Sequence, residues 1–169
     1  MEGIINAIIS LFSGITTSTY GKEILIFIIS MLPILELRGG ILAAALLNMK
    51  GLESFIICVL GNIIVIPISL WFLSFIFKIL KKNNFLNKIL TKFENKVLSK
   101  REKLDKYGYF GLFLFVGIPV PGTGVWTGCF LASLLNMDKK KSFLAALAGV
   151  IMAAIIMQVL SFGILKNIF

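Results

Sequence analysis

Two opposite charges, Glu36 and Arg38, interrupt an apolar part of the chain, after the twelve uncharged residues 24–35. A charge at bilayer depth costs about 2.5–3.5 kcal/mol even on a lenient scale, and it usually marks a transport pathway or proton relay. A guanidinium can bind a phosphate or carboxylate with two parallel hydrogen bonds, so Arg38 is the predicted anion contact. Burial disfavours a charged carboxylate, which makes Glu36 the predicted proton-coupling residue. A structural ion pair between them stays open as the alternative.

A second interruption, P-V-P-G-T-G-V-W-T-G, covers residues 119–128. Backbone outside a helix is tolerated at this depth only when it is buried in protein or lines a wet cavity. A half-helix starting near Val125 would direct its positive end, a ready anion site, toward the membrane centre. Trp126 is either packing or a lid. The predicted substrate-binding residues are Arg38, Gly39, Gly40, Gly122, Thr123, Gly124, Trp126 and Thr127, and the predicted helix breaks are Pro33, Pro119 and Pro121.

The two interruptions are related by an internal repeat at an offset of 88 residues, with eleven identities over the 31 positions 33–63. The word Leu-Leu-Asn-Met at 46–49 recurs at 134–137, and Gly61 falls on Gly149. Repeats with broken apolar segments are typical of secondary transporters, whose sites lie where the breaks meet. Gly61 and Gly149 are predicted to permit close helix packing.

Composition indicates an all-α integral membrane protein. Hydrophobic residues make up 58% of the chain, against roughly 45–50% in soluble domains. The net charge of +9 comes from basic residues between apolar segments, so we expect lipid contacts and no nucleic-acid partner. The absence of histidine removes the usual general base and commonest metal ligand. We therefore predict no enzyme, no catalytic residue, no metal and no cofactor, and we expect Cys58 and Cys129 to be packed free thiols.

Charge placement predicts how the chain crosses the membrane. Residues 54–77 and 142–165 are uncharged runs of 24 residues, against the ~20 needed for one span. The shorter halves around each break reach only about the midplane. From Lys78 to Lys106 there are ten basic and three acidic residues, and Lys139 to Lys141 follow the second break. The positive-inside rule puts both flanks in the cytoplasm, so the element between them is predicted to be a re-entrant hairpin.

These observations predict an inverted repeat of two units, each a re-entrant helical hairpin plus a transmembrane helix. The predicted segments are an interfacial or partly inserted helix at 1–22, repeat 1 at 23–78 (hairpin 23–50, span 54–78), a basic amphipathic linker helix at 79–106, and repeat 2 at 107–169 (hairpin 107–138, span 142–165). The linker is expected to lie on the cytoplasmic membrane surface and to bind anionic lipid.

The motifs E-L-R-G-G-I at 36–41 and I-P-V-P-G-T-G-V-W-T-G at 118–128 resemble signatures of the small multidrug export protein family, a relative of the DedA (VTT-domain) superfamily. The resemblance implies paired re-entrant hairpins in an inverted repeat. It also implies membrane transport, because DedA-type relatives are implicated in moving polyprenyl phosphate carrier lipid and eukaryotic relatives scramble phospholipids.

The predicted function is a proton-coupled transporter or flippase of a bacterial or archaeal inner membrane, binding an anionic or lipid-phosphate substrate between the two hairpin tips. One alternative is a phospholipid scramblase or an exporter of cationic drugs, with Glu36 as the counter-ion. Another is a non-transporting scaffold acting through the linker helix. The substrate, the coupling ion and the oligomeric state, a homodimer included, stay open.

The topology is tested by labelling single cysteines placed at Lys92 and Lys140. We expect both to react from the cytoplasmic side, because the hairpin between them returns to the side it entered. Labelling from opposite faces would turn the hairpin into a crossing.

Overall fold

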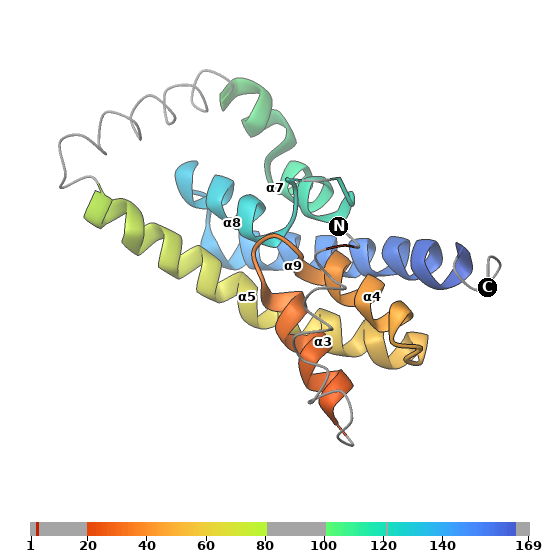
Figure 1. The fold of residues 1–169 in the computed structure, drawn as a ribbon. Coiled ribbons are helices and arrows are strands. Elements are labelled where there is room, and N and C mark those ends of the chain that lie inside the picture. Colours follow the sequence, from red (N-terminus) through yellow and green to blue (C-terminus); the bar gives the residue numbers. More distant parts are fainter. Residues whose placement is uncertain (1–2, 4–19, 81–100, 121, 165–169) are drawn as a thin grey trace.

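The computed structural model in Figure 1 describes residue 3 and residues 20–80, 101–120 and 122–164. Within these ranges the regular elements are all helical, as predicted. They are α3 (Gly21–Met31), α4 (Glu36–Leu46), α5 (Gly51–Leu80), α7 (Arg101–Gly117), α8 (Val125–Leu134), α9 (Lys139–Gln158) and the π-helix η1 (Val159–Ile164). Most of the predicted N-terminal helix at 1–22, most of the linker helix at 79–106, and Pro121 lie outside the described residues.

Each predicted break separates two short helices, which we call the first helix pair (α3 and α4) and the second helix pair (α7 and α8). In the first pair α3 ends at Met31, and Leu32 takes extended backbone with φ −67° and ψ 136°. The proline ring at Pro33 disfavours helical backbone in the preceding residue, which explains this end. In the second pair α7 ends at Gly117 and α8 begins at Val125, where the half-helix was predicted to start.

The predicted span 54–78 lies within α5, and the described part of the predicted span 142–165 lies in α9 and η1. Residues Gly51–Phe72 and Lys139–Gly163 are both long and apolar enough to cross a membrane, and only 39% and 28% of their most apolar windows are buried. On α5 the exposed large side chains recur every four residues, at Leu52, Ile56, Leu60, Ile64 and Ile68. The opposite face buries small or polar side chains, among them Ser54, Cys58, Asn62 and Ser69. Small and polar residues toward protein, with large apolar residues outward, are typical of a helix in lipid.

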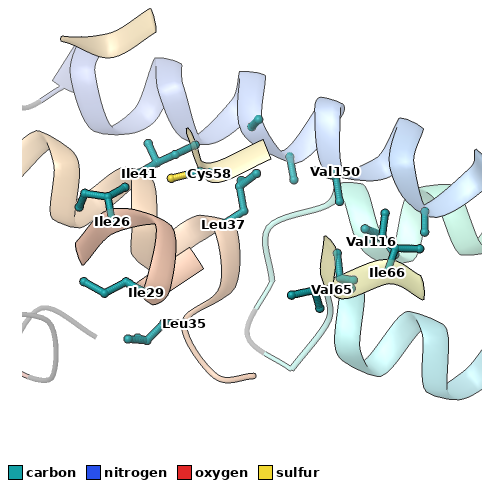
Figure 2. Close-up of a cluster of buried hydrophobic side chains, with 14 of the residues drawn as sticks. Ile26, Ile29, Leu35, Leu37, Ile41, Cys58, Val65, Ile66, Val116 and Val150 are labelled. Carbon is teal, nitrogen blue, oxygen red and sulfur yellow. The ribbon is translucent and has the colours of Figure 1, made fainter. Parts of the chain in front are cut away.

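Figure 1 shows α5 and α9 as long crossing rods with the shorter helices packed around them. The packing is the same for both halves: α3 lies on α5 as α7 lies on α9, while α4 also contacts α9 and α8 also contacts α5. Each helix pair therefore touches the long helix of both halves. One continuous core results, which Figure 2 shows running from Ile26 and Cys58 to Val116 and Val150. Both cysteines are buried free thiols, as predicted.

The repeated word Leu-Leu-Asn-Met builds the same turn twice. Asn48 and Asn136, which are 88 positions apart, both take left-handed backbone, with φ of 53° and 51°. In each turn the N–H of the following methionine donates to the carbonyl five residues earlier, Met49 to Ala44 and Met137 to Ala132, both at 3.0 Å. This is the hydrogen bond of a Schellman helix end, and asparagine tolerates the left-handed position it needs. The repeated sequence therefore adopts the same backbone conformation in both copies.

Gly61 and Gly149 are sites of close helix approach, as predicted. A Cβ at Gly149 would lie 2.7 Å from the carbonyl oxygen of Phe113 and 2.8 Å from Cβ of Val116, on α7. A Cβ at Gly61 would lie 2.1 Å from Oγ of Ser30, on α3. Each glycine therefore sets the distance between a long helix and the first helix of its own pair.

Candidate functional site: the joined tips of the two helix pairs

The first contact between the two tips is made by the Glu36 carboxylate. Glu36 begins α4, takes left-handed backbone with φ 50°, and is only 6% exposed. Its Oε2 accepts a hydrogen bond from the backbone N–H of Val125 at 3.2 Å, and its Oε1 accepts one from that of Trp126 at 3.1 Å. The first N–H groups of a helix have no partner within that helix and form its positive end. Glu36 therefore caps α8 from the opposite helix pair.

Gly124 leaves the space that this cap occupies. It directly precedes α8, and the offset of 88 pairs it with Glu36 in the other repeat. A Cβ at Gly124 would lie 1.8 Å from Oε2 of Glu36, and its φ of 131° is one that residues with side chains rarely adopt. The equivalent positions of the two repeats thus touch each other, and a carboxylate on one needs the absence of a side chain on the other.

The second contact between the tips is made by Arg38, which is 7% exposed. Its Nη1 donates to the carbonyl of Val120, and its Nη2 donates to the carbonyl of Ile118 at 3.3 Å and to Oγ1 of Thr123 at 2.7 Å. Ile118 directly follows α7, so the guanidinium lies at the negative end of that helix. A cation is stabilising there for the same reason that an anion is stabilising at the start of α8.

Trp126 makes a contact in the reverse direction. It is the residue that the offset of 88 pairs with Arg38. Its ring Nε1–H donates to the carbonyl of Met31, the last residue of α3, at 3.1 Å. Each tip thus sends one side chain, from the same repeat position, to the helix end in the other tip. Of the two roles left open for Trp126, this contact supports a structural one.

The structure brings together five of the predicted site residues: Glu36, Arg38, Thr123, Gly124 and Trp126. The others lie elsewhere. Gly39 and Gly40 are buried inside α4, where an added Cβ would meet Leu35 and Cys58 respectively. Gly122 has open space around it, Thr127 is half-buried on α8, Pro33 is exposed and Pro119 is half-buried.

The structure gives both charges partners that the sequence did not predict. Arg38 was predicted to contact an anion, and in the structure it donates to three neutral acceptors. The positive end of α8 was expected to face a ligand, but it holds the Glu36 carboxylate. The sequence analysis also missed the amides of Val125 and Trp126 as partners of Glu36. Matching Glu36 with Gly124 across the repeat was the signal that could have found them.

A cavity of about 370 Å³ lies within the second helix pair, next to the tips. It is lined by apolar side chains of α7 and α8, by glycine, and by Thr123. Thr123 is also the residue whose hydroxyl accepts from Arg38. The guanidinium is therefore one hydroxyl group away from an apolar space of the size that small-molecule pockets have, about 300–1,000 Å³.

The described residues form helices only, and two of these helices are long and apolar enough to cross a membrane, which is the composition of a membrane protein. The family model described as "Putative small multi-drug export protein" matches residues 36–156. The chain therefore belongs to the small multi-drug export protein family. No curated protein and no solved structure shows a significant match to it.

Replacing Gly124 by Ala should separate the tips, because the new methyl group and the Glu36 carboxylate cannot share one space. Gly122→Ala is the matched control, since Gly122 also has a positive φ, 85°, but nothing within 4 Å of an added Cβ. We expect Gly124→Ala to lower the unfolding free energy in detergent by about 1–3 kcal/mol more than Gly122→Ala does. Equal losses would mean that only backbone strain is being measured and that Glu36 is not held there.

Proposed function

We propose that the protein is a membrane exporter of amphipathic molecules with an anionic head group. The observation that carries this proposal is the apolar cavity of the second helix pair, whose lining includes Thr123, the residue whose hydroxyl accepts from Arg38. None of the described residues that line the cavity is charged, so the part of a substrate that enters it would be apolar. The head group would stay at the Thr123 end, beside the guanidinium.

Arg38 is suited to exchange its partners for such a head group. Its present acceptors are two carbonyls and one hydroxyl, all neutral. Hydrogen bonds to an ionised acceptor are shorter and roughly twice as strong as neutral ones. A phosphate or carboxylate reaching the end of the cavity would therefore displace the loop carbonyls and release one of the contacts that join the tips.

Glu36 would control the other contact. Adding a proton to its carboxylate removes the negative charge from the positive end of α8, which weakens the cap. Proton binding and head-group binding would then act on the same junction from its two sides, which is a physical route to proton-coupled export. Export of cationic drugs would instead need Glu36 as the counter-ion, and its two oxygens already accept from Val125 and Trp126. That geometry favours an anionic substrate at Arg38.

In this proposal the helix pairs are re-entrant hairpins of an inverted repeat, and separation of their tips gives alternating access in the inner membrane. The matching packing of the two halves and the duplicated helix ends support that arrangement. The relation to the DedA superfamily, lipid flipping and the cytoplasmic position of the linker stay predictions. A scaffold role predicts that changes at the tips leave function intact while changes of the linker lysines abolish it.

The anion contact is tested with a matched pair of fluorescent ligands, dansylaminoundecanoic acid and its uncharged methyl ester. The parent protein should bind the acid about tenfold more tightly than the ester, as expected for a charge-assisted contact. Arg38→Lys should lose most of that preference, because an ammonium lacks the planar fork. Leu135→Trp, which fills the cavity from the residue directly after α8, should weaken both ligands. A parent protein without preference for the acid would overturn the anionic head group but leave the cavity as a binding site.

The proton step is tested by the pH dependence of acid efflux from proteoliposomes. The parent should respond to an imposed pH gradient, whereas Glu36→Gln, which is neutral at every pH, should lose that response. Thermal melting of the purified variant is the control for folding. If the Glu36→Gln protein melts like the parent and keeps the full response to the pH gradient, Glu36 is not the proton-coupling residue.

A further inference from the structure

A second hollow lies on the outside of the molecule, between the end of α5 and the start of α9. It is a groove of about 340 Å³, lined by Pro67, Leu70, Trp71, Lys139, Lys140, Phe143 and Leu144. Its apolar walls are open, with Trp71 73% and Leu144 63% exposed. Ile68 and Phe72 are exposed beside Trp71 on the same helix, so the groove continues the apolar surface that α5 presents to lipid.

A polar hollow of about 210 Å³ adjoins this groove. Leu70 and Lys139 line both, and the other residues of the hollow are Ser133, Asn136 and Met137. Asn136 is exposed and Ser133 is half-buried. The apolar groove thus leads into a smaller space bordered by an amide, a hydroxyl and an ammonium group. An amphipathic molecule needs this combination, an apolar surface for its chain beside polar groups for its head.

The charge at this place is positive. Lys139 Nζ lies 5.8 Å from the centre of the Trp71 ring, within the range of a cation–π contact, and Lys140 lines the same groove. The neighbouring acid, Asp138, is turned to the helix start, where it accepts from the N–H of Lys141 at 2.9 Å. Lys141 itself lies over the Tyr109 ring, at 5.9 Å. Two ammonium groups therefore border the groove.

We propose that the groove and the polar hollow together bind one anionic phospholipid, with an acyl chain along Trp71 and Leu144 and the phosphate between Lys139 and Lys140. A lipid supplies the apolar chain and the anion from the same membrane that the α5 surface faces, whereas free phosphate would leave the groove empty. Basic residues near an anionic surface attract its lipids, so two lysines side by side give a preference for anionic lipid. The groove lies on α5 and α9, away from the proposed substrate cavity, and the polar hollow shares only Met137 with the lining of that cavity.

Quenching of Trp71 by brominated lipids tests the proposal. The full-length protein is reconstituted in vesicles of phosphatidylcholine with either brominated phosphatidylglycerol or brominated phosphatidylcholine at equal fraction. The Trp71→Phe protein reports Trp126 alone, and its signal is subtracted. We expect the anionic lipid to occupy the site at least about tenfold more strongly than the zwitterionic lipid, with a preference that falls as salt rises.

The lysine variants decide whether this preference belongs to the site. Lys139→Gln with Lys140→Gln should abolish it, and Lys139→Arg should keep it. Lys50→Gln, at an exposed lysine just before α5, is the matched control and should keep it as well. Equal quenching by both lipids would overturn the proposal, and so would an equal loss in the Lys50→Gln protein, which would show diffuse attraction to net charge. Displacement of the brominated anionic lipid by millimolar inorganic phosphate would also overturn it, because the site would then bind phosphate without an acyl chain.

Discussion

Helix ends that stop inside an apolar environment need partners, and this constraint organises the centre of the molecule. A backbone N–H or carbonyl group that is buried in protein without a partner costs free energy comparable to a lost hydrogen bond. The start of α8 is satisfied by Glu36, the end of α7 by Arg38, and the end of α3 by Trp126. All three side chains come from the opposite helix pair. Breaking the helices and joining the tips are therefore two aspects of one solution.

The joined tips also show how a duplicated chain has become asymmetric. Equivalent positions carry Glu36 and Gly124, then Arg38 and Trp126. Two glutamates facing each other would repel at close range, and two glycines would leave the start of α8 uncapped. One carboxylate and one glycine fill the shared space, so there is no repulsion between two charges and the start of α8 is capped. The first repeat thereby holds the buried Glu36 and Arg38, and the second holds the apolar cavity next to them.

Much of the architecture could be predicted from the sequence because it depends on local properties. Pro33 and Pro119 mark where helices stop, the two uncharged runs mark the two long helices, and the repeated Asn48 and Asn136 turns follow from residue type. Glu36 and Arg38 were found because charges within apolar sequence are costly. Their partners could not be found in the same way. The amides of Val125 and Trp126 and the carbonyl of Ile118 carry no side-chain signal, and they reach the charges only through packing of residues about 90 positions apart.

The central claim is that the Glu36 carboxylate caps α8 across the junction, and amide resonances of the labelled protein report it most directly. In the nitrogen–proton spectrum of Glu36→Gln, we expect the amide protons of Val125 and Trp126 to move upfield, because they lose a charged acceptor. The amide of Gly128, which donates to the Gly124 carbonyl at 2.8 Å within the helix, should stay in place. Unmoved resonances of Val125 and Trp126 would contradict the account and separate the two tips.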